Sequence, residues 1–268
     1  MAVLMLGQSM SSSKTDSTDP SEGRVQMTGG IPLGALGPAT IRVSWVTFLS
    51  FWLIVIALAT EYFPFRGADL DSHPWQAAFA ASALLYAGFA ANALIRIVVG
   101  KLIHLVPVEI TVLLSGPMVR FRPSLPWREG LIAFVGPLAS FVFAAIAYGV
   151  SVVLLNLGRS QLGASVFVWV AGMSLFLGVL NLLPASPLDG AAIVTAWARR
   201  RTPDADSMSS FVRSSTTALP FGLTLVGTAL ILAGAHLAGL LLAGLAIEFF
   251  RLEAQRRPEA SREINSGG

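Results

Sequence analysis

The sequence predicts an all-α polytopic membrane protein with six transmembrane helices and one small membrane-associated β-hairpin. Charged residues make up only 12% of the 268 residues and apolar residues 54%, whereas ordinary soluble domains are about 25% charged. The apolar residues gather in separate blocks, and several blocks approach or exceed the roughly 20 residues that a helix needs to cross the hydrocarbon core. The mean hydropathy of +0.70 reflects these blocks. A soluble globular fold is therefore excluded.

Three regions follow from the positions of the blocks. Residues 1–30 are rich in Ser, Thr, Asp and Gly, a composition that predicts a disordered cytoplasmic tail. Residues 31–252 form the membrane domain, and residues 253–268 form a cytoplasmic C-terminal tail. The six predicted spans cover about residues 44–62, 75–99, 130–155, 164–183, 218–234 and 236–250.

Two features in the first half of the chain support this division. Trp45 and Tyr62 stand near the ends of the first span, where aromatic side chains meet the membrane–water interface. Residues 106–121 are β-branched and contain a Gly116-Pro117 break, which predicts a short hairpin rather than a span.

The second half shows two breaks and one short helix. Gly136-Pro137 marks a kink or a close helix contact in the third span. After the fourth span the chain turns and starts a short helix from Gly190 toward Arg199. The last apolar stretch is too long for one comfortable span and is interrupted near His236, so two short antiparallel spans are expected.

The basic residues predict the orientation in the cell membrane. With six spans and a cytoplasmic N-terminus, all of the 18 Lys and Arg residues except Arg66 and Arg159 fall on the cytoplasmic side. This positive-inside bias places both termini in the cytoplasm. The basic residues are spread between apolar blocks and not gathered on one face, so no nucleic-acid partner is expected.

Asp189 is the most informative ionisable residue at membrane depth. A charged side chain at a helix centre costs about 2.5 to 3.5 kcal/mol on insertion scales. Asp189 follows the fourth span in the run Asn181-Leu-Leu-Pro-Ala-Ser-Pro-Leu-Asp-Gly190. It could cap the helix that begins there, or it could belong to an active or binding site.

This run resembles the NLLPxxPLDG signature of the site-2 proteases, the membrane-embedded zinc metalloproteases of the M50 type. The resemblance covers about residues 31–250, and other segments occur in the family's order. These are Ile41 to Trp45, Gly116 to Phe121, Glu129 to Pro137 and the final helical pair. The resemblance implies a site-2-protease-like fold.

The resemblance also implies a zinc site built from a His-Glu-x-x-His helix, in which histidines four apart share one face and the Glu acts as general base. The aspartate of the LDG motif supplies the third ligand in that family. Placed without a gap from Leu84-Leu85, the motif falls on Tyr86, Ala87 and Ala90. Asp189 is then the only ligand-type residue retained, and neither zinc nor another cofactor is expected.

No other residues offer a replacement for the missing pair. The chain has no cysteine and only three histidines. His73, His104 and His236 are far apart in sequence, and no two have the spacing of a helical metal site.

The function expected is therefore that of a catalytically inactive homologue, or pseudoprotease, which binds transmembrane segments of an integral membrane partner within the lipid bilayer. It would act as a scaffold, regulator or complex subunit. In the family a hairpin edge pairs with an unwound substrate segment, a form of strand addition. The partner-binding candidates are Asn181, Asp189, Glu109, Gly116 and Pro117.

Three alternatives stay open. The hairpin could be only a membrane-facing plug. The chain could be an active intramembrane metalloprotease with an unconventional metal site. It could also form a pathway for a small molecule or ion, although the spans carry almost no polar stripe and no inverted repeat is apparent.

Overall fold

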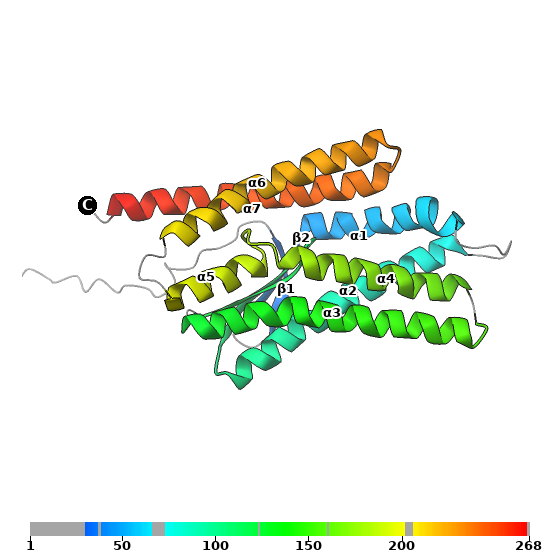
Figure 1. The fold of residues 1–268 in the computed structure, drawn as a ribbon, viewed down its shortest axis with the longest axis horizontal. Helices are drawn as coiled ribbons and strands as arrows, with labels where there is room; N and C mark the ends of the chain where they lie inside the picture. The colour runs from blue at the N-terminus through cyan, green and yellow to red at the C-terminus, as the bar shows by residue number, and fades with distance from the viewer. Residues whose placement is uncertain are drawn as a thin grey trace, which may run out of the picture.

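The structure is a computed structural model that describes residues 30–36, 39–65, 73–122, 124–159, 161–201 and 206–266. Most of these residues are helical (Figure 1). The elements in chain order are β1 (Gly30–Leu36), β2 (Ala39–Ser44), α1 (Trp45–Ala57), η1 (Leu58–Tyr62), η2 (Phe63–Phe65), α2 (Pro74–Leu102), β3 (Pro107–Leu113), β4 (Gly116–Phe121), α3 (Pro126–Asn156), α4 (Gln161–Asn181), α5 (Asp189–Arg201), α6 (Asp206–Leu232) and α7 (His236–Ser266).

Among the described residues, five helical segments are long and apolar enough to cross a membrane. They are Trp45–Tyr62, Pro74–Leu102, Pro126–Asn156, Gln161–Asn181 and Ser210–Leu232. The predicted helical membrane architecture is confirmed, whereas the count of six spans stays a prediction. The apolar part of α7 runs from His236 to Phe250 with Glu248 near its end, and Arg251 and Glu253 follow directly after it.

The C-terminal helices are longer than the sequence suggested. The break before His236 is present, because Gly234 adopts a left-handed φ of 90° that ends α6. However, α7 continues to Ser266 where a tail was expected from residue 253. The added turns contain many Glu, Arg, Ala and Gln residues, which favour helix. The predicted tail over residues 1–30 lies outside the described residues apart from Gly30.

The sheet is larger than the predicted hairpin. It has four strands in the order β1-β2-β3-β4, with antiparallel β1–β2 and β3–β4 pairs and a parallel β2–β3 pair. The parallel pair sets Ile41 opposite Ile110 and Val43 opposite Val112. The segment before α1 thus adds strands to the hairpin. The sequence prediction missed these strands, although Ile41 and Val43 of β2 alternate with polar residues.

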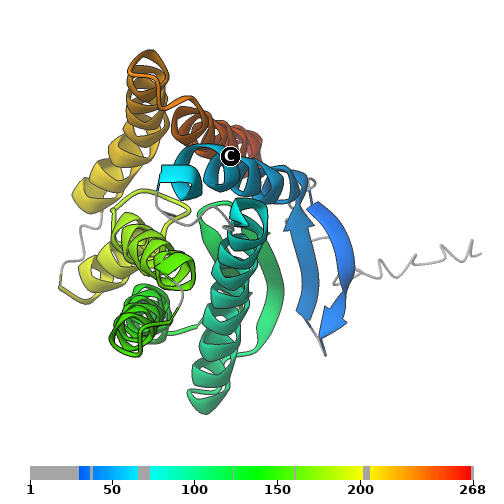
Figure 2. The same cartoon turned by 90° about the vertical axis from the view of Figure 1, so that its right-hand side faces the viewer.

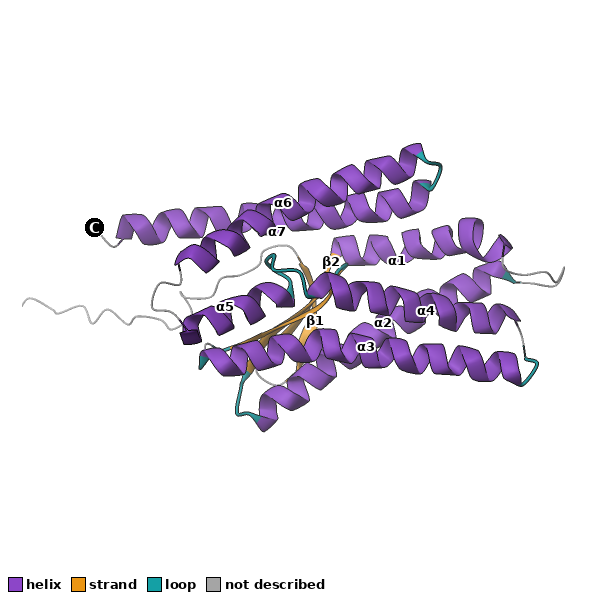
Figure 3. Cartoon of the chain, in the orientation of Figure 1, coloured by secondary structure: helices purple, strands orange, loops and turns teal. Residues whose placement is uncertain are grey.

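The sheet lies among the helices near one end of the bundle (Figure 3). Helix α2 packs on β3 and β4, while α3 packs against α2, α4 and α5, and α7 packs against α1 and α6. Figure 2 places β1 at the outer edge of the molecule, with α3, α4 and α5 on the opposite side. This arrangement brings the start of α5 close to the middle of α2 and α3.

The turn between β3 and β4 is the point at which three helices hold the sheet. Leu114 and Ser115 are buried there, so their backbone groups need partners inside the protein. Leu114 N donates to a carboxylate oxygen of Glu248 on α7 at 3.0 Å, and Asn181 on α4 donates to Ser115 O at 3.4 Å. Thr47 on α1 donates to Val112 O at 2.9 Å.

Glu248 offers a direct test of this arrangement. Replacing Glu248 by Ala leaves the buried Leu114 N–H unpaired, a loss of about 1 to 3 kcal/mol. Thermal unfolding in a mild detergent should therefore show a lower melting temperature for Glu248→Ala and a smaller decrease for Glu248→Gln, which keeps an acceptor oxygen. Its neighbour Ile247 is exposed, so Ile247→Ala is the control. Equal stability of Glu248→Ala and Ile247→Ala would contradict the assignment.

Candidate functional site

The site is centred on an ion pair between Asp189 and Arg96. Asp189 is the first residue of α5, directly after the loop that follows α4. Arg96 Nη1 donates to Asp189 Oδ1 at 2.7 Å, and Arg96 Nη2 donates to Asp189 Oδ2. Only 5% of the Arg96 side chain and 15% of the Asp189 side chain are exposed. Both carboxylate oxygens therefore face the guanidinium, which is a different role from capping α5.

Asn92 and helix α3 complete the pairing of Arg96. Arg96 Nε donates to Asn92 Oδ1 at 2.9 Å, one turn earlier on α2. Asn92 Nδ2 in turn donates to Gly136 O at 2.9 Å and to Ser140 Oγ at 3.0 Å. The network links α2, α3 and α5 through donors and acceptors that are all buried or half-buried.

Gly136 makes room for this ion pair. A Cβ atom at position 136 would collide with the Arg96 guanidinium and would lie 2.6 Å from Asp189 Oδ2. The Gly136-Pro137 pair, predicted to mark a kink or close contact, is thus a close contact with charged side chains. Any larger residue at position 136 would push Arg96 and Asp189 apart.

Four of the five predicted partner-binding residues lie together. A small cavity of about 20 Å³ is bordered by Leu113, Ser115, Gly116, Pro117, Met118, Asn181, Pro187, Leu188 and Asp189. Glu109 lies elsewhere, on the sheet, where it pairs with Arg42 at 3.8 Å and with Arg120 at 3.4 Å. The hairpin therefore contributes its turn to the neighbourhood of Asp189, and Glu109 joins β2, β3 and β4.

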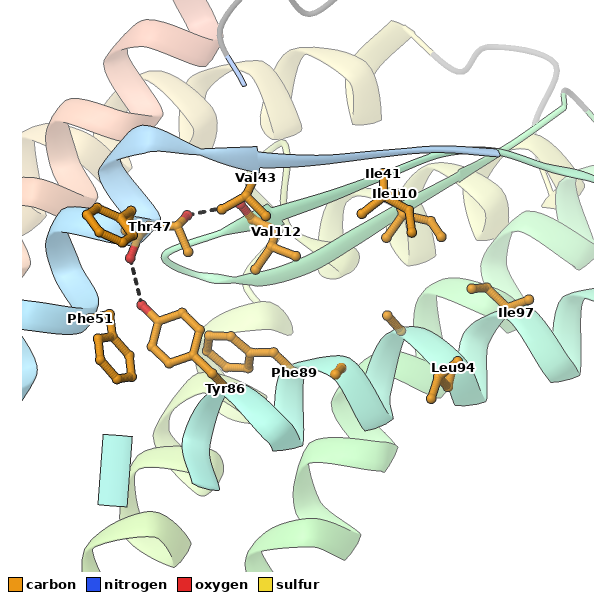
Figure 4. A pocket seen from close by; sticks show the side chains of 13 residues that line it. Ile41, Val43, Thr47, Phe51, Tyr86, Phe89, Leu94, Ile97, Ile110 and Val112 are labelled. Carbon is orange, nitrogen blue, oxygen red and sulfur yellow. Dashed lines mark hydrogen bonds between the residues drawn. The ribbon is translucent and has the colours of Figure 1, made fainter. Parts of the chain in front are cut away.

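Tyr86, Ala87 and Ala90 do not face Asp189, so placing the metal motif on them disagrees with the structure. The Tyr86 hydroxyl donates to Thr47 O at 3.0 Å (Figure 4). It also lies 2.9 Å from Ser50 Oγ. Ala87 and Ala90 are exposed on α2. The α2 side chain that contacts Asp189 is Arg96, and Asn92 is bonded to Arg96. The prediction that this span is wholly apolar and that Arg96 lies on the cytoplasmic side is also corrected, because Arg96 is a buried residue of α2.

A second, larger pocket lies on the other face of α2. It has a volume of about 530 Å³ between the sheet, α1 and α2 (Figure 4). Its lining is almost entirely apolar and includes Ile41, Val43, Phe51, Phe89, Ala93, Leu94, Ile97 and Ile110. The Thr47 and Tyr86 hydroxyls at its border already have hydrogen-bond partners. The pocket therefore suits an apolar occupant.

Known proteins are similar to this chain in sequence and in fold. The model of Peptidase family M50 matches residues 159–223. The protein described as "Putative zinc metalloprotease Rip3" of Mycobacterium tuberculosis is 28% identical over 206 residues in strains Erdman and H37Rv. The match covers 76% of this chain and 52% of Rip3, so the chain spans about half the length of that relative. The Site-2 Protease from Methanocaldococcus jannaschii has the same fold, with a TM-score of 0.55, 21% identity and coverage of 82% of this chain and 94% of that chain.

The chain is thus similar to the M50 peptidase family, in sequence over residues 159–223 and in fold over most of its length. The matched segment contains α4, α5 and the first part of α6, and it includes Asp189. The predicted site-2-protease-like fold is confirmed by the structural similarity. The five long apolar helices among the described residues, together with this similarity, indicate a multi-pass membrane protein.

The residues around Asp189 do not fit the zinc ion that an M50 fold implies. In the part of the chain that the structure describes, no three His, Cys, Asp or Glu side chains gather as a metal site. His73 lies at the start of α2, His104 in the turn after α2, and His236 at the start of α7. The groups beside Asp189 are a guanidinium, which has no lone pair to give, and an amide.

Sequence reasoning missed Asn92, Arg96 and Glu248. The sequence prediction counted Arg96 among the basic residues on the cytoplasmic side and assigned no role to Glu248. The available signal was a polar pair four residues apart, Asn92 and Arg96, inside an otherwise apolar stretch. In a membrane helix such residues are expected to face protein and to have partners.

The ion pair should dominate the stability of this region. Removing one member of a buried pair costs about 3 to 5 kcal/mol, because the other charge is left buried and unpaired. We expect Arg96→Met and Asp189→Asn each to lower the unfolding free energy strongly in detergent. The double variant should lose much less than the two single losses combined.

Glu109→Gln is the control for this cycle. The Glu109 pairs on the sheet have longer separations, and Arg42 and Arg120 are more exposed than Arg96, so a smaller loss is expected. Purely additive losses for Arg96→Met and Asp189→Asn would show that the two side chains are not coupled.

Proposed function

We propose that this M50 homologue is catalytically inactive and binds a transmembrane segment of an integral membrane partner, as a scaffold, regulator or complex subunit. The observation that carries the proposal is the ion pair of Arg96 with Asp189. It engages both oxygens of the one retained ligand-type residue. The fold of a membrane protease is thus kept around a centre without its reactive groups.

The chemistry around Asp189 supports inactivity. Metal-assisted peptide hydrolysis needs a metal ion that polarises the carbonyl and activates a water molecule, together with a general base. Asn92 and Arg96 have no basic group at neutral pH, and Asp189 is occupied by Arg96. We accordingly propose that the chain uses neither zinc nor another cofactor.

The large pocket supports partner binding. Phe48 and Leu94 border it and are exposed, and both lie on helices long and apolar enough to span the bilayer. Ala90 and Ala93 have small side chains at its α2 wall, so a bulky apolar side chain of a second helix has room to enter. We propose that a partner helix packs on this face, with the lipid bilayer around both proteins.

The hairpin offers a second contact. β4 is an outer strand of the sheet, and its first residues Gly116 and Pro117 border Asn181 and Asp189. An extended segment of the partner could add beside β4, since outer strands have unpaired backbone groups. Asn181 and Asp189 would then border the added segment, in addition to their roles inside the chain.

The partner-binding proposal can be tested by site-specific photo-cross-linking in native membranes. A photoreactive side chain at Phe48 or Leu94 should give a cross-link to one membrane protein, whereas the same side chain at Leu225 should not. Leu225 is an exposed residue of α6 and does not border the pocket. Bulky Ala93→Phe should fill the pocket and reduce the Leu94 cross-link several-fold. Cross-links to lipid alone at Phe48 and Leu94 would refute the proposal.

We further propose that both termini lie in the cytoplasm. The positive-inside bias supports this orientation, and so does the antiparallel packing of α7 along α6 (Figure 1). If α6 crosses the bilayer and α7 returns beside it, the C-terminus lies on the same side as the N-terminus.

The absence of cysteine makes the orientation simple to measure. Arg159 and Arg200 are both exposed. They lie at opposite ends of the bundle, because Arg159 comes after the end of α3 and Arg200 lies at the end of α5. A membrane-impermeant thiol reagent should label Arg159→Cys in intact cells and Arg200→Cys only after permeabilisation. The reverse pattern would place the termini outside.

A further inference from the structure

We infer that Arg96 is the cation that replaces the metal ion of this fold, and that Asn92, Ala93 and Arg96 occupy the three chemical positions of the His-Glu-x-x-His motif. The inference deepens the proposed function and rests on it, because it says what took the place of the metal. It also moves the motif six residues along α2 from the position that the sequence suggested.

Helix geometry supports this position. Residues 92 and 96 are four apart and share one face of α2, as the two histidines of the motif do. Arg96 reaches Asp189, and Asn92 reaches Arg96. Ala93 follows Asn92, where the motif has its Glu, and it is buried at the edge of the apolar pocket.

The alternative position faces another direction. A shift of six residues rotates a side chain by roughly 240° about a helix with 3.6 residues per turn. Tyr86 accordingly contacts Thr47 and its neighbour Ser50 on α1, and Ala90 borders the apolar pocket. Neither side chain lies at the Asp189 end of the network.

Charge explains why the fold keeps Asp189. A buried carboxylate without a cation is strongly unfavourable, and removing a metal without compensation would leave one. The Arg96 guanidinium supplies a positive charge, two donors for Asp189 and a third for Asn92. Gly136 leaves the space in which the guanidinium lies. The guanidinium thereby connects α2, α3 and α5, as a metal ion could, but it offers no open coordination position.

The test is to restore the motif. In full-length protein, Asn92→His, Ala93→Glu and Arg96→His together place two imidazoles beside Asp189. The purified variant should retain about one zinc ion per chain after desalting, where the wild-type chain retains none. Cobalt(II) in place of zinc should give the visible absorption of a four-coordinate site. Adding Asp189→Asn should remove most of the bound metal.

The matched control is the same set of residue types in the other frame, Tyr86→His, Ala87→Glu and Ala90→His. It should bind no stoichiometric zinc. A folded restored variant without zinc, or equal zinc in the control, would overturn the inference. Partner cross-links at Phe48 and Leu94 in the wild-type chain do not depend on this result, so the two proposals fail separately.

A second measurement decides the matter if the restored variant does not fold. In native membranes, the pair Arg96→Cys and Asp189→Cys should be joined by a short bifunctional thiol reagent, and the pair Tyr86→Cys and Asp189→Cys should not. A protease site engineered into the loop between α3 and α4 makes the link visible on a gel. Cross-linking of the Tyr86 pair alone would overturn the inference.

Discussion

The bidentate ion pair of Arg96 with Asp189 is the constraint on which the surrounding structure depends. A buried arginine within an apolar helix needs a partner inside the protein, and for Arg96 the partner comes from a different element, the start of α5. The pair therefore fixes how α5 approaches α2. Gly136 on α3 must be glycine for the two charged groups to meet, and Asn92 binds the remaining guanidinium edge.

A metal ion and a guanidinium can hold a fold in similar ways but differ in chemistry. Both supply positive charge to a buried carboxylate and join helices distant in sequence. A metal can bind water and lower its pKa, whereas every nitrogen of a guanidinium is a donor and none can act as a base. Replacing one by the other would keep α5 joined to α2 through Asp189 and would remove the reaction, which is how a fold can persist without its activity.

The sequence predicted the helical membrane fold because that signal is long and repeated. The family resemblance came from Asn181 to Gly190, where prolines and polar residues interrupt apolar helices. The position of the motif on α2 was harder to predict, since an apolar helix with few polar residues can be aligned from either end. Counting from Leu84-Leu85 selected Tyr86, whereas the contacts of Asp189 select Arg96. Strands β1 and β2 were missed although Gly37-Pro38 between them is a turn signal, because Ile41 to Trp45 was interpreted as the entry to the first span.

Irregular backbone buried inside a membrane protein needs side-chain partners, and this requirement explains the buried polar residues around the β3–β4 turn. The turn at Leu114 and Ser115 is buried, and water cannot satisfy its backbone groups there. Glu248 from α7 and Asn181 from α4 supply these hydrogen bonds, and Thr47 from α1 donates to Val112 O, two residues before the turn. The buried turn of the sheet is therefore held by polar residues on helices that are otherwise apolar. Two separate groups of buried polar residues thus connect elements distant in sequence, one at the Asp189 centre and one at the hairpin.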